Sequence, residues 1–313
     1  AQLIVEGRLV AEGLPDANIR FARASNATDW EGIHFVNTTA DNRITHAIIE
    51  GSTRDEGMID LDNSRLTIEN SVFEHADRRR INSVNSSLIV RNSTFADFVF
   101  PSGPPNNVAE HIQGRNVPDG GEFLIENNVF GLTPGHNDSI DFDAGHRLSG
   151  DPVPQVINNV FMGGGDDALD IEGDFYIQGN VFMHYRKDAA HAAVDGGESN
   201  VISAGDAHLA GHHYVVTGNV FYDADHVTLV KQGSFMTFTN NTVVNVDQGA
   251  YAAVPGVFNF DLAGQTSFKD VFVNIKELPL LGQVKIGHFK EPFGMEQLIA
   301  SKYTTFMERS PGD

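Results

Sequence analysis

The chain has 313 residues, of which 41% are hydrophobic and 20% charged, so its composition is that of a folded globular protein. Its 42 acidic residues outnumber its 21 Lys and Arg, and the formal net charge of −21 argues against a nucleic-acid partner, because phosphates would be repelled. The absence of Cys excludes disulfides and thiolate metal sites, and no apolar run is long enough to predict a transmembrane helix. The chain begins at Ala1 without Met or a signal-like segment, so we expect a mature form or a fragment.

One short pattern recurs along the first 250 or so residues. In Ile68–Phe73, for example, an apolar residue is followed by a polar one, an Asn, another polar one and Val-Phe. The Asn or Gly of the pattern stands at Asn70, Asn92, Asn127, Asn158, Gly179, Gly218 and Asn240. The shortest spacings are 21 and 22 residues, and the longer ones indicate loop insertions. Units of this size cannot bury an apolar face alone, but stacked units form a continuous core.

This repeat predicts an all-β fold of stacked coils, in which strands of successive coils lie about 4.8 Å apart. Segments 29–35 and 44–49 are expected in its first coils. The Asn positions should lie at bends, where Asn tolerates the left-handed conformation and its amide can hydrogen bond to the next coil. One aromatic column should stack inside, formed by Phe73, Phe95, Phe130, Phe161, Phe182 and Phe221.

These repeats resemble the right-handed parallel β-helix family, and residues 1–250 are similar to the β-helix segments of large planctomycete-type surface proteins. The resemblance implies an extracellular or cell-surface protein that works as a monomer with a polysaccharide as its partner. It says more about architecture than about activity.

Aligning the segment before each repeat predicts one acidic face. Alternation points Ile, Leu and Phe inward, and it brings Asp141, Asp143, Asp170 and Glu172 within one coil step of each other. Repulsion among them would raise a pKa unless a cation lies there. Oxygen ligands at this density suit Ca²⁺, so these four residues are a predicted Ca²⁺ site, with a solvated acidic face as the alternative. Arg115 and Lys231 flank the cluster.

Two Asp-rich strings precede the same strands. Residues 137–141 (Asn-Asp-Ser-Ile-Asp) and 165–169 (Gly-Asp-Asp-Ala-Leu) resemble motifs of the polygalacturonase-type glycoside hydrolases. In that family, carboxylates on adjacent coils supply the general acid and activate water. The resemblance implies a set of candidate catalytic residues: Asp138, Asp141, Asp166, Asp167 and Asp170. The family's Arg-Ile-Lys is only partly matched, because Leu229 stands where Arg should be, and its Gly-His-Gly is matched only loosely around His212.

A Ca²⁺-dependent lyase is a further enzyme hypothesis, with Lys231 or Lys187 as the base. The segment 184–213 is predicted to be the largest loop insertion, with dispersed His residues. Candidate substrate-binding residues around the acidic face are Arg115, His136, Lys187 and His212.

The composition changes near Pro255-Gly256. Residues 1–255 hold two Lys, whereas residues 256–313 hold five. Alternation in 267–276 and 283–290 around Pro279–Gly282 predicts a β-hairpin, so the expected domains are 1–255, the β-helix, and 256–313, a hairpin with a short helix. Segments 289–298 and 305–310 resemble the phosphate-selective porin O/P family, and this resemblance covers about residues 261–313. A single hairpin cannot close a barrel.

Three functions therefore remain open. The first is a polysaccharide-binding protein with Ca²⁺ on the acidic face. The second is a polysaccharide hydrolase or lyase, and the third is a structural module of a larger surface protein.

Overall fold

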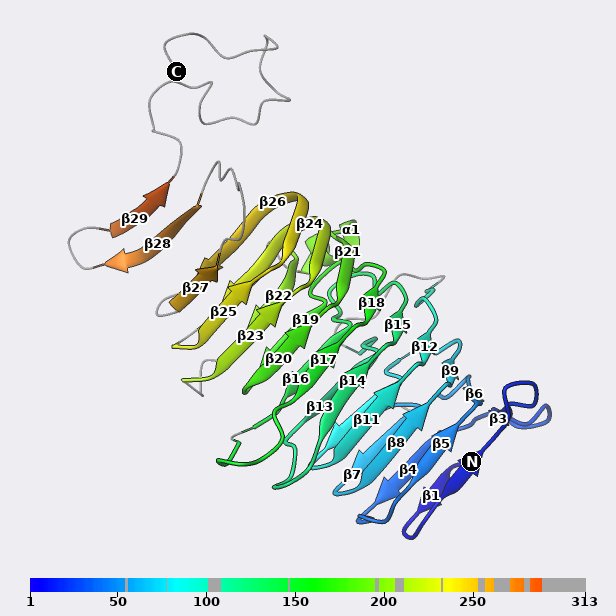
Figure 1. Ribbon diagram of the computed structural model, residues 1–313. Coiled ribbons are helices and arrows are strands. Elements are labelled where there is room, and N and C mark those ends of the chain that lie inside the picture. The colour runs from blue at the N-terminus through cyan, green and yellow to red at the C-terminus, as the bar shows by residue number, and fades with distance from the viewer. Residues whose placement is uncertain are drawn as a thin grey trace. The chain divides into compact units, whose positions relative to one another are not determined.

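The computed structural model describes residues 1–53, 56–76, 78–100, 108–145, 147–194, 197–205, 211–231, 233–252, 257–261, 271–278 and 282–288. The chain divides into two compact units, Ala1–Asp261 and Leu262–Asp313. In the first unit, short strands repeat along the chain and stack coil upon coil from β1 to β26 (Figure 1). Every printed pairing between strands of this unit is parallel, which confirms the predicted right-handed β-helix.

Each coil contributes one strand to each of three stacks. The first stack contains β1 (Leu3–Val5), β4 (Ile33–Val36), β7 (Ile59–Asp62), β10 (Ile81–Val84), β13 (Ile112–Arg115), β16 (Ile140–Asp143), β19 (Leu169–Glu172) and β22 (Asn200–Ala204). The second contains β2 (Val10–Glu12), β5 (Arg43–Thr45), β8 (Arg65–Glu69), β11 (Ser87–Arg91), β14 (Phe123–Glu126), β17 (Gln155–Ile157), β20 (Phe175–Gln178), β23 (His213–Thr217), β25 (Phe235–Thr239) and β27 (Val257–Asp261). The third contains β3 (Ile19–Phe21), β6 (Ala47–Ile49), β9 (Val72–Phe73), β12 (Thr94–Phe95), β15 (Val129–Phe130), β18 (Val160–Phe161) and β21 (Val181–Tyr185). The long strands β24 (Val220–Val230) and β26 (Thr242–Ala252) continue both the first and the third stack.

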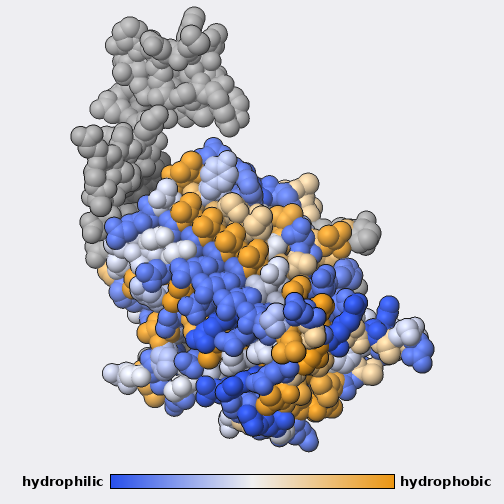
Figure 2. Space-filling model, turned by 45° about the vertical axis from the view of Figure 1, so that its right-hand side comes forward, coloured by the Kyte–Doolittle hydropathy of each residue, from blue (hydrophilic) through white to orange (hydrophobic). Residues whose placement is uncertain are grey.

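The core follows the predicted alternation. In β16, Ile140 and Phe142 are buried while Asp141 and Asp143 are partly exposed, and β19 repeats this pattern. The predicted Phe column is confirmed, because neighbouring rings from Phe73 to Phe221 stack with centroids 4.5 to 5.2 Å apart. On the surface, rows of apolar side chains run between bands of polar ones (Figure 2).

The bends confirm half of the Asn prediction and correct the other half. The seven repeat positions from Asn70 to Asn240 all have a positive φ, between 50° and 68°. From Asn127 onward, however, the inter-coil ladder is formed by the residue that follows each repeat position: Asn128, Asn159, Asn180, Asn219 and Asn241. In each step the side-chain oxygen of one Asn accepts both the backbone N–H and the side-chain N–H of the Asn before it. The left-handed residue turns its own side chain outward, so the next residue points into the core.

The predicted loop at 184–213 is wrong in part. It contains helix α1 (Ala189–Val194) and strand β22, which is a complete rung of the first stack. One column of paired positions runs along this stack, with Asp60, Asn82, Gln113, Asp141 and Asp170 on successive rungs, and it is called the acidic column. Ser203 of β22 follows Asp170 in this column and precedes Leu229.

The second unit holds the predicted hairpin, in which β28 (Val271–Leu278) pairs antiparallel with β29 (Gly282–His288). The short helix and the porin-like segments expected after residue 288 lie outside the described residues, as does the expected boundary at 255–256. Within the described residues, no helix is long and apolar enough to cross a membrane.

Candidate functional site

A polar cleft lies beside the turns that lead from the third stack into β16, β19 and β22. It has a volume of about 590 Å³, within the usual range for ligand sites. Seven acidic residues line it, namely Glu110, Asp138, Asp141, Asp166, Asp167, Asp170 and Glu198. The basic residues in its wall are Arg79 and Lys231, and the imidazole rings of His136 and His191 also line it. All six candidate catalytic residues of the sequence thus belong to a single cleft.

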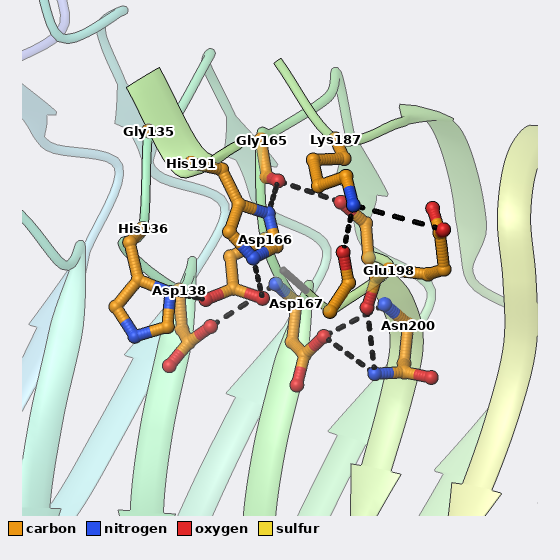
Figure 3. Close-up of polar contacts among 12 residues, drawn as sticks. Gly135, His136, Asp138, Gly165, Asp166, Asp167, Lys187, His191, Glu198 and Asn200 are labelled. Atoms are coloured by element: carbon orange, nitrogen blue, oxygen red, sulfur yellow. Dashed lines mark hydrogen bonds and ion pairs between the residues drawn. The ribbon is translucent and has the colours of Figure 1, made fainter. Parts of the chain in front are cut away.

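Asp138 and Asp167 occupy adjacent coils on the floor of the cleft (Figure 3). The backbone N–H of Asp167 donates to Asp138 Oδ1 at 3.0 Å. Asp167 Oδ1 accepts the backbone N–H of Asn200 at 2.7 Å and its side-chain N–H at 3.2 Å. The remaining oxygen of each carboxyl group points away from the turns, on the same side of both (Figure 3). Backbone contacts between three successive coils therefore fix the direction of this pair.

Burial and mutual repulsion favour the neutral form of these groups. Desolvation, followed by the charges of Asp167 and Asp170, raises the pKa of Asp138 well above its usual value. Desolvation and Asp166 do the same to the pKa of Asp167, although the donors of Asn200 act in the opposite direction. Desolvation raises the pKa of Asp141 to about 6, against the stabilising hydrogen bond from Gln113.

Asp166 lies between two imidazole rings (Figure 3). Its Oδ2 is 2.7 Å from His136 Nδ1, and its Oδ1 is 3.9 Å from His191 Nε2. The ring centroids of the two His residues are 5.2 Å apart. Asp166 is thus turned toward the His residues, whereas its neighbour Asp167 is turned toward Asn200.

One carboxylate outside the cleft positions this part of the wall. Asp188 Oδ1 accepts the backbone N–H groups of Ala190 and His191 and caps α1. Asp188 Oδ2 accepts the N–H of Gly135 at 2.8 Å, next to His136. A Cβ on Gly165 would lie 2.7 Å from the backbone N and O of Gly135 and 2.6 Å from Asp188 Oδ2, so this close approach requires glycine.

Farther along the first stack, Asp141 and Asp170 are paired in register. Asp141 Oδ2 accepts a hydrogen bond from Gln113 at 2.9 Å. Lys231 Nζ donates to Asp170 Oδ1 at 3.1 Å, reaching across the Ser203 rung. Lys231 therefore neutralises part of the acidic column, as its predicted flanking position requires.

The predicted Ca²⁺ ligands do not converge in the same way. Within the described residues, ligand atoms of two groups lie within 4.8 Å of one another: His136, Asp166 and His191, and Asp138, Asp166 and Asp167. The quartet of Asp141, Asp143, Asp170 and Glu172 is not one of these groups. Asp143 Oδ1 accepts the N–H of Gly145, and Asp170 already has an ammonium partner. Binding of Ca²⁺ by the quartet therefore stays a prediction, and it would require these side chains to move closer together.

The four candidate substrate-binding residues do not lie together: two lie at the cleft and two lie outside it. His136 lines the cleft. Lys187 lies at its rim, with Nζ 3.6 Å from Glu198 Oε1. Arg115 lies opposite Asp143 in the register and is exposed outside the cleft. His212 precedes β23 of the second stack, 4.0 Å from Asp174, and also lies outside the cleft.

Sequence reasoning missed the roles of His191, Asn200 and Asp188. All three belong to the segment that was predicted to be a loop. Strand β22 is buried at all five positions instead of alternating, and α1 is inserted between β21 and β22, so this rung lay within the longest interval between repeat positions. The one available signal was the string Asp188–His191, in which Asp precedes an alanine-rich turn as a helix cap does.

No family model and no curated protein matches this sequence. Two solved structures of a GH87 alpha-1,3-glucanase catalytic domain in complex with tetrasaccharides are similar, with 12% and 15% identity and TM-scores of 0.42. Each alignment covers 84% of this chain, which spans 63% and 62% of those chains. PfbA, a surface adhesin of Streptococcus pneumoniae, is similar with 13% identity, a TM-score of 0.33 and 91% of both chains covered. The porin resemblance has no support among these matches, and the activity has to be argued from the cleft itself.

Proposed function

We propose that the chain is a glycoside hydrolase that cleaves a polysaccharide lying in the acidic cleft, with Asp138 and Asp167 as its two catalytic carboxylates. One observation carries the proposal: two carboxyl groups from adjacent coils each present one oxygen on the same side at the floor of an open, polar cleft. Glycoside hydrolysis needs such a pair. One carboxyl group protonates the leaving glycosidic oxygen, and the other, as a carboxylate, activates a water molecule or attacks the anomeric carbon of the sugar.

The hydrogen bonds distinguish the two roles. Asp167 accepts two N–H donors from Asn200, which favour its ionised form. Asp138 accepts a single backbone donor and faces several other carboxylates. We assign Asp138 as the general acid and Asp167 as the carboxylate that activates water or attacks the sugar. Asp141 and Asp170, along the column, are assigned to contacts with the sugar hydroxyls.

Lys231 favours hydrolysis over β-elimination. A lysine base must be neutral, which requires a lowered pKa. Burial does lower the pKa of Lys231, but the adjacent Asp170 outweighs it, and the net shift is upward. Lys231 is therefore a protonated partner of Asp170 and a poor base.

The charge of the cleft suggests the class of substrate. Its lining has seven acidic residues against Arg79 and Lys231, and each of these two bases contacts a carboxylate. A polyuronate would bring further anions into this surface, whereas a neutral or amino-sugar polymer would not. A polysaccharide substrate also implies an extracellular or cell-surface location, which is part of the proposal.

Reducing-end release from a panel of neutral, amino-sugar and uronate polysaccharides tests this proposal. Asp138→Asn and Asp167→Asn should each lower the rate about 100- to 10,000-fold. Asp62→Asn is the matched control, because Asp62 is an exposed acid on the same stack outside the cleft. Wild-type protein that releases no product from any polymer, or variants that retain full activity, would contradict the assignment.

Two other functions are outcomes of the same experiment. Saturable glycan binding without product would indicate a binding protein, and neither binding nor product would leave a structural module.

Thermal unfolding tests the predicted Ca²⁺ site separately. A rise of the melting temperature with Ca²⁺ concentration would support Ca²⁺ binding by Asp141, Asp143, Asp170 and Glu172.

A further inference from the structure

Two imidazoles and one carboxylate form a compact cluster at the edge of the cleft. The ligand atoms of His136, Asp166 and His191 all lie within 4.8 Å of one another. His136 and Asp166 come from the turns before β16 and β19, and His191 comes from α1. The proposed hydrolysis assigns no role to these two His residues.

The hydrogen bond of His191 determines which ring nitrogen faces the cluster. Its Nδ1 contacts the carbonyl oxygen of Gly165, which can only accept, so Nδ1 carries the proton. In the neutral ring, Nε2 then carries the lone pair, and it is directed at Asp166 (Figure 3). The distance of 3.9 Å to Asp166 Oδ1 is too long for a hydrogen bond. His191 is 1% exposed, so the lone pair of its Nε2 is buried and directed into the cluster.

This arrangement is typical of histidine ligands to metals. A metal-bound His usually donates its other ring N–H to a backbone carbonyl or a carboxylate, which fixes the tautomer and the ring orientation. Ser199 Oγ also donates to the Gly165 carbonyl, at 2.6 Å, and so holds that acceptor in place.

The spacing fits an ion of the size of Zn²⁺. With metal–ligand bonds of about 2.0–2.1 Å in tetrahedral geometry, neighbouring ligand atoms lie roughly 3.3 Å apart. Asp166 Oδ2 lies 2.7 Å from His136 Nδ1, Asp166 Oδ1 lies 3.9 Å from His191 Nε2, and one ligand atom of each residue lies within 4.8 Å of the other two. Small side-chain adjustments are needed to bring one carboxylate oxygen and both ring nitrogens to the tetrahedral spacing.

We propose that His136, His191 and Asp166 bind a divalent first-row transition cation such as Zn²⁺, independently of any glycan. Two imidazole nitrogens and one carboxylate favour this class over Ca²⁺ and Mg²⁺, which take oxygen ligands. Asp138, which shares the second convergent group with Asp166, lies close enough to hydrogen bond to a water on the ion while it keeps its own proton.

Asp188 is the positioning residue of this site. Its two oxygens hold the backbone on both sides of the cluster, at His191 and at Gly135. Without Asp188 the three ligand residues would still be present, but their backbones would no longer be held at fixed positions relative to one another.

Isothermal titration of tag-free, chelator-treated protein with Zn²⁺ tests the proposal, and the visible spectrum of a Co²⁺ titration gives a second readout. We expect one ion per chain and no competition from millimolar Ca²⁺. His136→Asn and His191→Asn should each weaken binding roughly 100-fold or more. His213→Asn is the control, because His213 is exposed on the second stack and bonds to Thr237.

His136 is partly exposed, so its substitution should leave the melting temperature unchanged even where that of His191 does not. The site would be overturned if wild-type protein showed no saturable Zn²⁺ binding, or if both variants bound Zn²⁺ as tightly as wild type. Neither readout involves glycan cleavage, so failure of the metal site and failure of the hydrolase proposal are separate results.

Discussion

Among single residues, Asp141 gives the clearest test of how far the acidic column is desolvated. Its carboxyl group lies between Gln113 and Asp170 on neighbouring rungs. Burial raises its pKa from 3.8 to about 6, so the folded protein binds this proton more tightly than the unfolded chain does. The resulting stabilisation is present below about pH 4 and is lost as the pH rises through about 6.

Asp141→Asn removes this titration and keeps an oxygen for Gln113. We expect the variant to be more stable than wild type at pH 8, by up to about 3 kcal/mol, and the difference to shrink toward pH 4. Denaturant unfolding at pH 4, 6 and 8 measures it. A difference that does not change with pH would show that Asp141 titrates normally.

The same residues show what could be predicted locally. The Asp strings at 137–141 and 165–169 could be placed side by side from sequence, because each leads into a strand whose register follows from the repeat, and both line the cleft. That Asp166 turns toward His136 while Asp167 turns toward Asn200 could not be predicted, because it depends on contacts from α1 and β22, far along the chain.

Among the elements, the Asn ladder is the main polar feature of the core. Asn159 is fully buried, accepts two hydrogen bonds from Asn128, and donates to Ile125 and Asn180. Asn159→Ala would leave those partners unsatisfied and should cost about 3 kcal/mol of unfolding free energy. Its neighbour Asn158 has a φ of 55°, and Gly occupies the equivalent position at 179, so Asn158→Gly should be nearly neutral.

Chemical unfolding of both variants provides the comparison. Equal losses at 158 and 159 would mean that the bend, rather than the ladder, carries the stability. The repeat pattern identified these positions but could not assign the ladder between them, since both are Asn in several coils.

Helix α1 matters through its cap. Asp188→Ala removes the acceptor of the Ala190, His191 and Gly135 N–H groups. We expect Zn²⁺ affinity to fall about 10- to 100-fold while both His ligands remain, and the same titration measures it. Unchanged affinity would show that the packing of α1 alone places His191. This element was missed from sequence because six residues carry too weak a helical period.

For the whole molecule, the fold was predictable because a repeat multiplies a weak signal. Phe182 and Phe221, 39 residues apart in sequence, stack because every coil repeats the same turn. The function was less accessible, because a β-helix carries many activities and because His191, Glu198 and Asn200 of the cleft come from the segment that breaks the repeat.

Net charge makes a prediction at this scale. At −21, with an acidic cleft, the protein should act on neutral or amino-sugar polymers and should bind polyuronates weakly. Affinity for a cationic polymer should fall as salt is raised, whereas affinity for a neutral one should not. Tight, salt-sensitive binding of a polyuronate would contradict this charge argument.

The most direct test of the central claim measures binding and cleavage in the same Asp167→Asn protein. Because Asp167 acts on the reacting atoms, the variant should bind the polysaccharide that wild type cleaves with similar affinity. It should release product about 100- to 10,000-fold more slowly, with an unchanged melting temperature. Cleavage at the wild-type rate by this folded variant would show that the catalytic pair is not at Asp138 and Asp167.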